Sequence, residues 1–178
     1  MKVWEIIGLI LSLLFIVFNR KIRLWKIFVE QFKVYKNDKT QKTSCFDIVS
    51  FIVSPIVLSV LIARLLPYKD VVESSGTIIT VFSIIATLLL SFLALLVDKS
   101  TSNQKEKDVI NQTFVTITID IIYSVLVVLL FVLPQFIVFT EVLEKIFVGL
   151  VSFMVIKILL NVFMVLKRVY AVMSNTDN

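Results

Sequence analysis

Five long apolar stretches alternate with short polar joints along this chain. They cover residues 3–18, 45–66, 75–97, 113–139 and 146–166. A helix needs ~20 apolar residues to cross the hydrocarbon core of a bilayer, and four of the five stretches reach or exceed that length. The first is shorter, and a short segment crosses only with local thinning of the bilayer. The pattern predicts an all-α fold, a polytopic transmembrane helical bundle with five spans, or with four if 3–18 does not cross.

The composition leaves little room for anything outside the membrane. Of the 178 residues, 58% are hydrophobic and 17% are charged. With only three glycines and three prolines, the chain lacks the composition of a flexible linker. We therefore expect a single membrane domain over residues 1–178, with the lipid bilayer as its main surroundings.

Two residue types that often carry chemistry are scarce. The sequence contains no histidine, and Cys45 is its only cysteine. The usual zinc sites and Ser–His or Cys–His catalysis require these residues, and a single thiol cannot form an internal disulfide. There is also no Gly-rich phosphate loop. We expect no enzymatic activity, no metal site and no cofactor.

Positive charge is concentrated between the first two apolar stretches. Against only Glu30 and Asp38, this basic segment (19–44) carries eight cations: Arg20, Lys21, Arg23, Lys26, Lys33, Lys36, Lys39 and Lys42. Lysines and arginines near membrane ends collect on the cytoplasmic side, and loop 98–112 and the C-terminal tail carry further ones. The charge predicts a cytosolic C-terminus and a cytosolic basic segment, so the N-terminus is outside with five spans and inside with four. Because its position explains the net charge of +5, we expect no direct nucleic-acid binding.

Part of the basic segment has helical spacing. Ile22, Trp25, Val29 and Phe32 recur every three or four residues between Arg20 and Lys36, with charged residues on the other faces. This indicates an amphipathic helix that lies in the headgroup layer. The cations either only fix the topology or also dock a cytosolic partner or acidic lipid.

Small polar residues follow a helical repeat in the third stretch, at Thr80, Ser83, Thr87 and Ser91. Small residues at this spacing let membrane helices approach closely. The repeat predicts a helix-packing face, within one chain or between copies; a pore lining is the alternative.

The last two stretches contain intramembrane charges. In the fourth, Gln112, Thr116, Asp120 and Ser124 share one helix face, and in the fifth Met154, Lys157, Asn161 and Met164 share another. A lone charge in the membrane is costly, so we hypothesise an Asp120–Lys157 pair, with Asn161, Thr116 and Ser124 taking the remaining hydrogen bonds. The pair holds helices together, or has a signalling or ion-path role.

A proline interrupts the second stretch. Pro55 lacks a backbone N–H and should kink that helix, with Ser54 or Ser59 helping to satisfy the freed carbonyl.

Two function classes fit these observations. The first is an interaction subunit, a membrane sensor or scaffold that holds a cytosolic partner through the basic segment, loop 98–112 and the tail. The second is an oligomeric channel or membrane-disrupting effector that assembles around the polar faces. Both classes involve a homo-oligomer or a protein partner, and neither involves catalysis.

A resemblance adds to the first class. The run from Ala86-Thr87-Leu88 to Val97-Asp98-Lys99, the hydrophilic joint 100–112 and the opening Thr113-Phe114-Val115-Thr116-Ile117 form one hairpin. In layout this looks like the central hairpin of small membrane proteins encoded beside bacterial anti-phage genes, such as the membrane subunit of Kiwa-type systems. The resemblance implies an oligomeric inner-membrane protein that senses phage infection and works with a soluble partner; it assigns no residue a role. We expect a multi-pass bacterial inner-membrane sensor or scaffold in antiviral defence.

Overall fold

The computed structural model describes residues 24–34, 45–98, 104–136 and 138–174, and every element within them is a helix. For these residues the predicted all-α fold is confirmed. In chain order the elements are α2 (Leu24–Val34), α3 (Cys45–Ile48), the π-helix η1 (Val49–Val53), α4 (Ser54–Leu65), α5 (Tyr68–Glu73), α6 (Ser75–Asp98), α7 (Gln104–Val132), the 3-10 turn η2 (Leu133–Gln135) and α8 (Glu141–Ser174).

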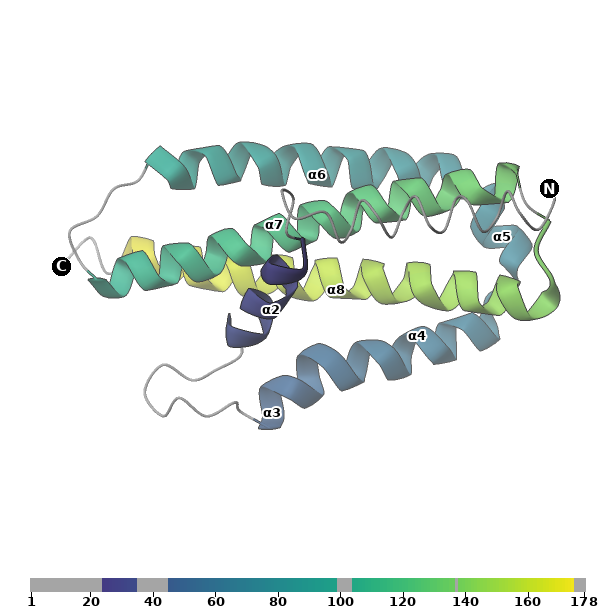
Figure 1. Cartoon of the computed structure of the whole chain (residues 1–178), viewed down its shortest axis with the longest axis horizontal. Coiled ribbons are helices and arrows are strands. Elements are labelled where there is room, and N and C mark those ends of the chain that lie inside the picture. The colour runs from purple at the N-terminus through teal and green to yellow at the C-terminus, as the bar shows by residue number, and fades with distance from the viewer. Residues whose placement is uncertain (1–23, 35–44, 99–103, 137, 175–178) are drawn as a thin grey trace.

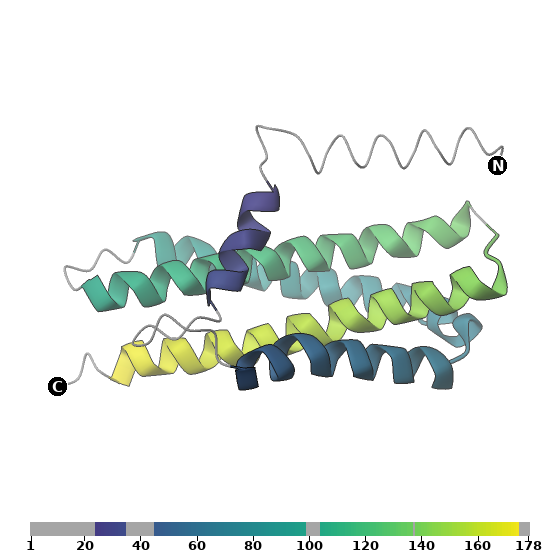
Figure 2. The ribbon, with the colours of Figure 1, turned by 60° about the horizontal axis from the view of Figure 1, so that its bottom comes forward.

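Four long helical units run side by side (Figure 1). The first is continuous from α3 through η1 to α4, and the others are α6, α7 and α8. Helix α7 packs against both α6 and α8, and α4 packs against α8. Each is antiparallel to the helices that it contacts, whereas α2 crosses α7 at a steep angle (Figure 2).

Three of these helices are long and apolar enough to cross a membrane. They are Ser75–Leu96, Lys107–Gln135 and Glu141–Tyr170, whereas the apolar helix Val49–Leu65 is shorter. The described helices are thus compatible with a membrane-embedded protein. The predicted segment 3–18 lies outside the described residues, so a total of five or four spans stays a prediction.

The helix bounds agree with the apolar pattern at some ends and not at others. Stretches 45–66 and 75–97 match α3–α4 and α6 closely, but α7 and α8 extend well beyond stretches 113–139 and 146–166 at their polar ends. The expected loop 98–112 is therefore wrong over most of its length, because α7 begins at Gln104. Residues 104–112 contain no glycine or proline and several good helix formers, so the helix continues past the apolar stretch. At the other end Pro134 stops α7, and the chain continues as η2.

The apolar core has two parts. The larger joins α6, α7 and α8 near α5 and includes Phe82, Val127, Phe131, Phe147 and Ile158. Phe131 and Phe147 meet edge to face, with ring centroids 5.5 Å apart and an interplanar angle of 88°. The smaller part, toward the other end of the bundle, contains Leu89, Ile117 and Val165. On α7 these two parts of the core are separated by the turns between Ile117 and Val127.

The edge-to-face contact generates a stability prediction. Phe131 is 2% exposed, so Phe131→Ala leaves a cavity between α7 and α8 and should lower the free energy of unfolding by about 3 kcal/mol. Phe163 on α8 is 66% exposed and is the matched control, since Phe163→Ala opens no cavity and should cost about 0.5 kcal/mol or less. Unfolding of both variants in the same detergent provides the measurement. Equal costs for the two variants would contradict the packing described.

Candidate functional site

A layer of buried polar residues lies between the two parts of the core. We call Thr116, Asp120, Ser124, Lys157 and Asn161 the polar layer; none is more than 5% exposed. The first three recur every four residues on α7 and the other two lie one turn apart on α8, so one face of each helix supplies them. The structure therefore brings together the two polar faces that the sequence predicts.

Asp120 and Asn161 join α7 to α8 directly. Asn161 Nδ2 donates a hydrogen bond to Asp120 Oδ1 at 2.7 Å, and both side chains are fully buried. Asp120 Oδ2 and Asn161 Oδ1 have no hydrogen-bond partner among the described residues. Asn161 is therefore the hydrogen-bond partner that the structure gives the Asp120 carboxylate.

The two hydroxyls of the polar layer do not take the remaining bonds of that carboxylate. Ser124 Oγ donates to the backbone carbonyl of Asp120 at 2.8 Å, and Thr116 Oγ1 donates to that of Gln112 at 2.9 Å. Serine and threonine inside helices commonly satisfy their hydroxyls on the preceding turn in this way. The expectation that they complete the Asp120 site is thus wrong.

Lys157 connects α8 to the helical unit that contains Pro55. Its ammonium Nζ donates to the backbone carbonyl of Phe51, in η1, at 2.9 Å. In an α-helix that carbonyl would accept from residue 55, but residue 55 is a proline and has no N–H. Lysine, and not the expected serine, is therefore the side-chain donor at the interruption; Ser59 Oγ donates to Ile56 O instead.

The structure places Lys157 near Asp120, as the hypothesis of a pair requires, but it gives the two side chains different hydrogen-bond partners. Lys157 lies close enough for its positive charge to act on the Asp120 carboxylate. The hydrogen bonds, however, run from Asn161 to Asp120 and from Lys157 to Phe51 O. The two charges therefore share one buried region while bonding to different atoms.

Sequence reasoning missed one further cation. Arg168 is half-buried, and one of its terminal nitrogens lies 3.4 Å from Thr116 Oγ1, at the limit for a hydrogen bond. It is the next member of the α8 series Lys157, Asn161, Met164, so extending that spacing by one turn would have found it. Arg168 extends the polar layer toward the end of the bundle where α7 begins.

The predicted helix-packing stripe faces away from the bundle. All four of its residues are exposed, and the side of α6 that packs inward carries Phe82 and Leu89 instead. Thr80, Thr87 and Ser91 donate their hydroxyls to α6's own backbone, on Gly76, Ser83 and Thr87. Among the residues that the structure describes, the stripe is not part of a packing contact, and its alternative, contact between copies, stays a prediction.

The basic segment is only partly described. Among its eight cations, Lys26 is exposed on α2, Lys33 lies in α2, and the others lie outside the described residues. The predicted amphipathic helix is present, but Phe28 packs on Tyr123 of α7, with ring centroids 6.0 Å apart, and Gln31 is buried. Val29, on the predicted apolar face of this helix, is 41% exposed. Because Tyr123 lies past the midpoint of α7, α2 packs against the side of the bundle and not around its end.

The polar layer is suited to binding helices together more than to holding an ion. Within the described ranges no group of three His, Cys, Asp or Glu side chains is placed to coordinate a metal. The charged and amide groups instead bond across elements, from α8 to α7 and from α8 to η1. Hydrogen bonds of this kind stabilise contacts between membrane helices.

Comparisons of the chain with protein-family models, with curated proteins and with solved structures find no match.

The Asp120–Asn161 hydrogen bond can be tested with a double-mutant cycle. Asn161→Leu and Asp120→Leu should each lower the free energy of unfolding by about 1 kcal/mol or more, because each leaves a buried polar partner without its bond. The double variant should cost less than the two single costs combined, as measured by unfolding in detergent. Asn111→Leu, at an exposed position of α7, is the control. Strictly additive costs would rule the bond out.

The hydrogen bond from Lys157 to Phe51 O is needed because residue 55 is a proline. A second double-mutant cycle, with variants of Lys157 and Pro55, tests this dependence. Lys157→Met should lower the free energy of unfolding by about 2 kcal/mol, the scale of a hydrogen bond to a charged group. In a Pro55→Ala background the cost should fall by at least about half, because residue 55 then supplies an N–H for Phe51 O. Lys69→Met, at an exposed position, should cost nothing measurable. An equal cost of Lys157→Met in both backgrounds would refute the assignment.

Proposed function

We propose that this protein is a non-enzymatic, multi-pass protein of a bacterial inner membrane. It acts as a sensor or scaffold subunit for a cytosolic partner protein. The observation that carries the proposal is the polar layer. Its charges bond across α7, α8 and η1, so they hold three separate chain segments in one register. A fixed register is what a scaffold needs, and a buried polar contact is where a sensor can change state.

The proposed orientation rests on the distribution of cations. Lys107 near the start of α7 and Lys167 and Arg168 near the end of α8 lie at one end of the bundle, and the basic segment adds the largest group of cations in the sequence. Cytoplasmic ends of membrane helices carry such an excess of lysine and arginine. We infer a cytosolic C-terminus, with five spans and an external N-terminus, or four spans and an internal one.

The setting in antiviral defence rests on the resemblance of the α6–α7 hairpin to small membrane proteins of anti-phage systems. In the proposed mechanism a disturbance of the membrane shifts α7 and α8 relative to each other, and the basic segment transmits the shift to a soluble partner. Homo-oligomers are part of the same proposal, because the exposed stripe of α6 offers small side chains to a second copy.

The same stripe favours one second candidate, an oligomeric channel or membrane-disrupting effector. Its hydroxyls lie on one exposed face of a spanning helix, and several copies of α6 would bring those faces together. Purified protein in liposomes would conduct ions under this candidate, and would leave the liposomes sealed under the first.

The sensor or scaffold proposal is tested by capturing the partner. Full-length protein extracted from its native membrane should bring down a soluble protein, and changing Lys33, Lys36, Lys39 and Lys42 to glutamine should reduce the yield by about tenfold, since rim charges govern association. Lys69→Gln neutralises an exposed lysine of α5 and should leave the yield unchanged. No loss with the fourfold variant, or ion flux from the pure protein, would count against the proposal.

A further inference from the structure

An apolar groove runs along the outside of the bundle between α4 and α8. Its volume is about 520 Å³, within the range of small-molecule sites. Ile56 and Val60 of α4 form one wall and Leu150 and Phe153 of α8 form the other, and three of these four are at least 41% exposed. In a bilayer this groove would face the acyl chains of lipid.

Small residues form the floor of the groove. Ser59 is buried and Ala63 is half-buried on α4, and Gly149 lies opposite them on α8; a Cβ built on Gly149 would lie 3.5 Å from Ala63 Cβ. The helix backbones can therefore approach closely at this level. Because the residues on either side are larger, the close approach leaves a furrow above the contact.

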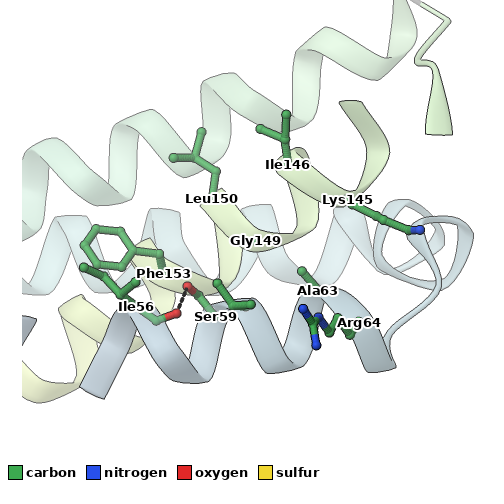
Figure 3. Close-up of a pocket in the computed structure, with 10 residues that line it drawn as sticks. Ile56, Ser59, Ala63, Arg64, Lys145, Ile146, Gly149, Leu150 and Phe153 are labelled. Atoms are coloured by element: carbon green, nitrogen blue, oxygen red, sulfur yellow. Dashed lines mark hydrogen bonds between the residues drawn. The ribbon is translucent and has the colours of Figure 1, made fainter. Parts of the chain in front are cut away.

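The groove has a charged end. Arg64 and Lys145 lie together at one end, and Ile56 and Phe153 lie at the other (Figure 3). The charged end is near the last turn of α4 and the first turn of α8, where these helices would leave the hydrocarbon. Long basic side chains reach the headgroup region from such positions.

A second cavity of about 330 Å³ adjoins this end and shares Ala63, Arg64 and Lys145 with the groove. It is also lined by Glu141, Glu144 and Tyr68, so its charged groups are two cations and two carboxylates. Lys145 Nζ pairs with Glu141 Oε1 at 3.2 Å. In the described part of the chain, Arg64 and Glu144 form no ion pair, so one positive and one negative group remain for a ligand.

The phenol of Tyr68 adds a neutral donor. Burial, and secondly the negative charge of Glu144, raise the pKa of Tyr68 above its ordinary value of 10.0. The hydroxyl therefore keeps its proton at any physiological pH and can donate a hydrogen bond. Glu144 lines the same cavity.

We propose that the groove and the adjoining cavity form a site for one phospholipid with a phosphate and a primary ammonium in its headgroup. One acyl chain lies in the groove, Arg64 binds the phosphate, and Glu144 accepts a hydrogen bond from the ammonium. A headgroup that is only anionic matches the site less well, because it would place negative charge beside Glu144. The inference rests on the membrane placement within the proposed function, but on no partner protein and no sensing role.

The test uses delipidated full-length protein and native mass spectrometry to measure binding of phosphatidylethanolamine, phosphatidylglycerol and phosphatidylcholine. Phosphatidylethanolamine should bind most tightly, and Arg64→Gln should weaken its binding about tenfold, the effect of losing one charge-assisted hydrogen bond. Glu144→Gln should remove the preference over phosphatidylglycerol. Glu73→Gln changes a carboxylate of α5 that pairs with Lys69 and should have no effect.

The groove itself has a matched pair of variants on α4. Val60→Trp places a large side chain in the groove and should abolish binding of one lipid, whereas Val57→Trp introduces the same residue at an equally exposed position outside it. Helix content by circular dichroism shows that the variants fold. Tighter binding of phosphatidylglycerol, or equal binding by the two tryptophan variants, would overturn the proposal. These results concern the pure protein, so they are separable from a failure to find a cytosolic partner.

Discussion

Lys157 and Pro55 together determine how the helix of residues 45–65 joins the rest of the molecule. Proline cannot donate to Phe51 O, and inside a bilayer no water would be available to that carbonyl. Lys157 Nζ donates a hydrogen bond to this carbonyl from α8, at 2.9 Å. The carbonyl thereby gains a donor and the buried ammonium gains an acceptor. In a membrane, a lysine ammonium without an acceptor and a carbonyl without a donor would each carry a free-energy cost. Both costs fall only when α4 lies against α8 at the level where the two groups meet. This contact therefore fixes the register of α4, and with it the close approach of Gly149 to Ala63.

The position of the polar layer in the bundle allows it to select one offset between α7 and α8. Apolar clusters close it off on both sides, with Val127 and Phe131 toward one end and Ile117 and Val165 toward the other. In lipid, apolar packing alone discriminates poorly between alternative offsets of two helices, because a neighbouring helix and a lipid tail are equally apolar. The hydrogen bond from Asn161 to Asp120 exists at one offset only. A membrane sensor built on such a layer has a discrete contact that can be made or lost, which a uniformly apolar interface does not have.

The spacing of residues in the sequence predicts much of this arrangement. The contacts that it does not predict depend on features that spacing does not contain. The period of a helix is sufficient to place Asp120 with Thr116 and Ser124, and Lys157 with Asn161, on two facing sides. It does not determine which α8 side chain reaches the carboxylate, because that depends on a relative shift of about one turn between α7 and α8. The partner of Lys157 is a backbone atom 106 residues away, and a backbone atom has no signature in the sequence. Only the position of Pro55 indicated that this carbonyl needed a donor.

The small residues also show that spacing does not identify the element that packs against a given helix face. They bear on the proposed lipid site as well. Spacing identifies Thr80, Ser83, Thr87 and Ser91 as a face that permits close approach, but it cannot tell which element, if any, lies opposite. Within the described chain the close approach occurs elsewhere, between Gly149 of α8 and the Ser59–Ala63 turn of α4. That contact brings two backbones together beneath larger neighbours and so produces a groove with cations at one end. The groove is thus a consequence of the register that Lys157 imposes, and a lipid seated in it would stabilise that register against others. Lipid composition would then act on the contact of α4 with α8, and α8 also forms the contact with α7 that the proposed sensor changes.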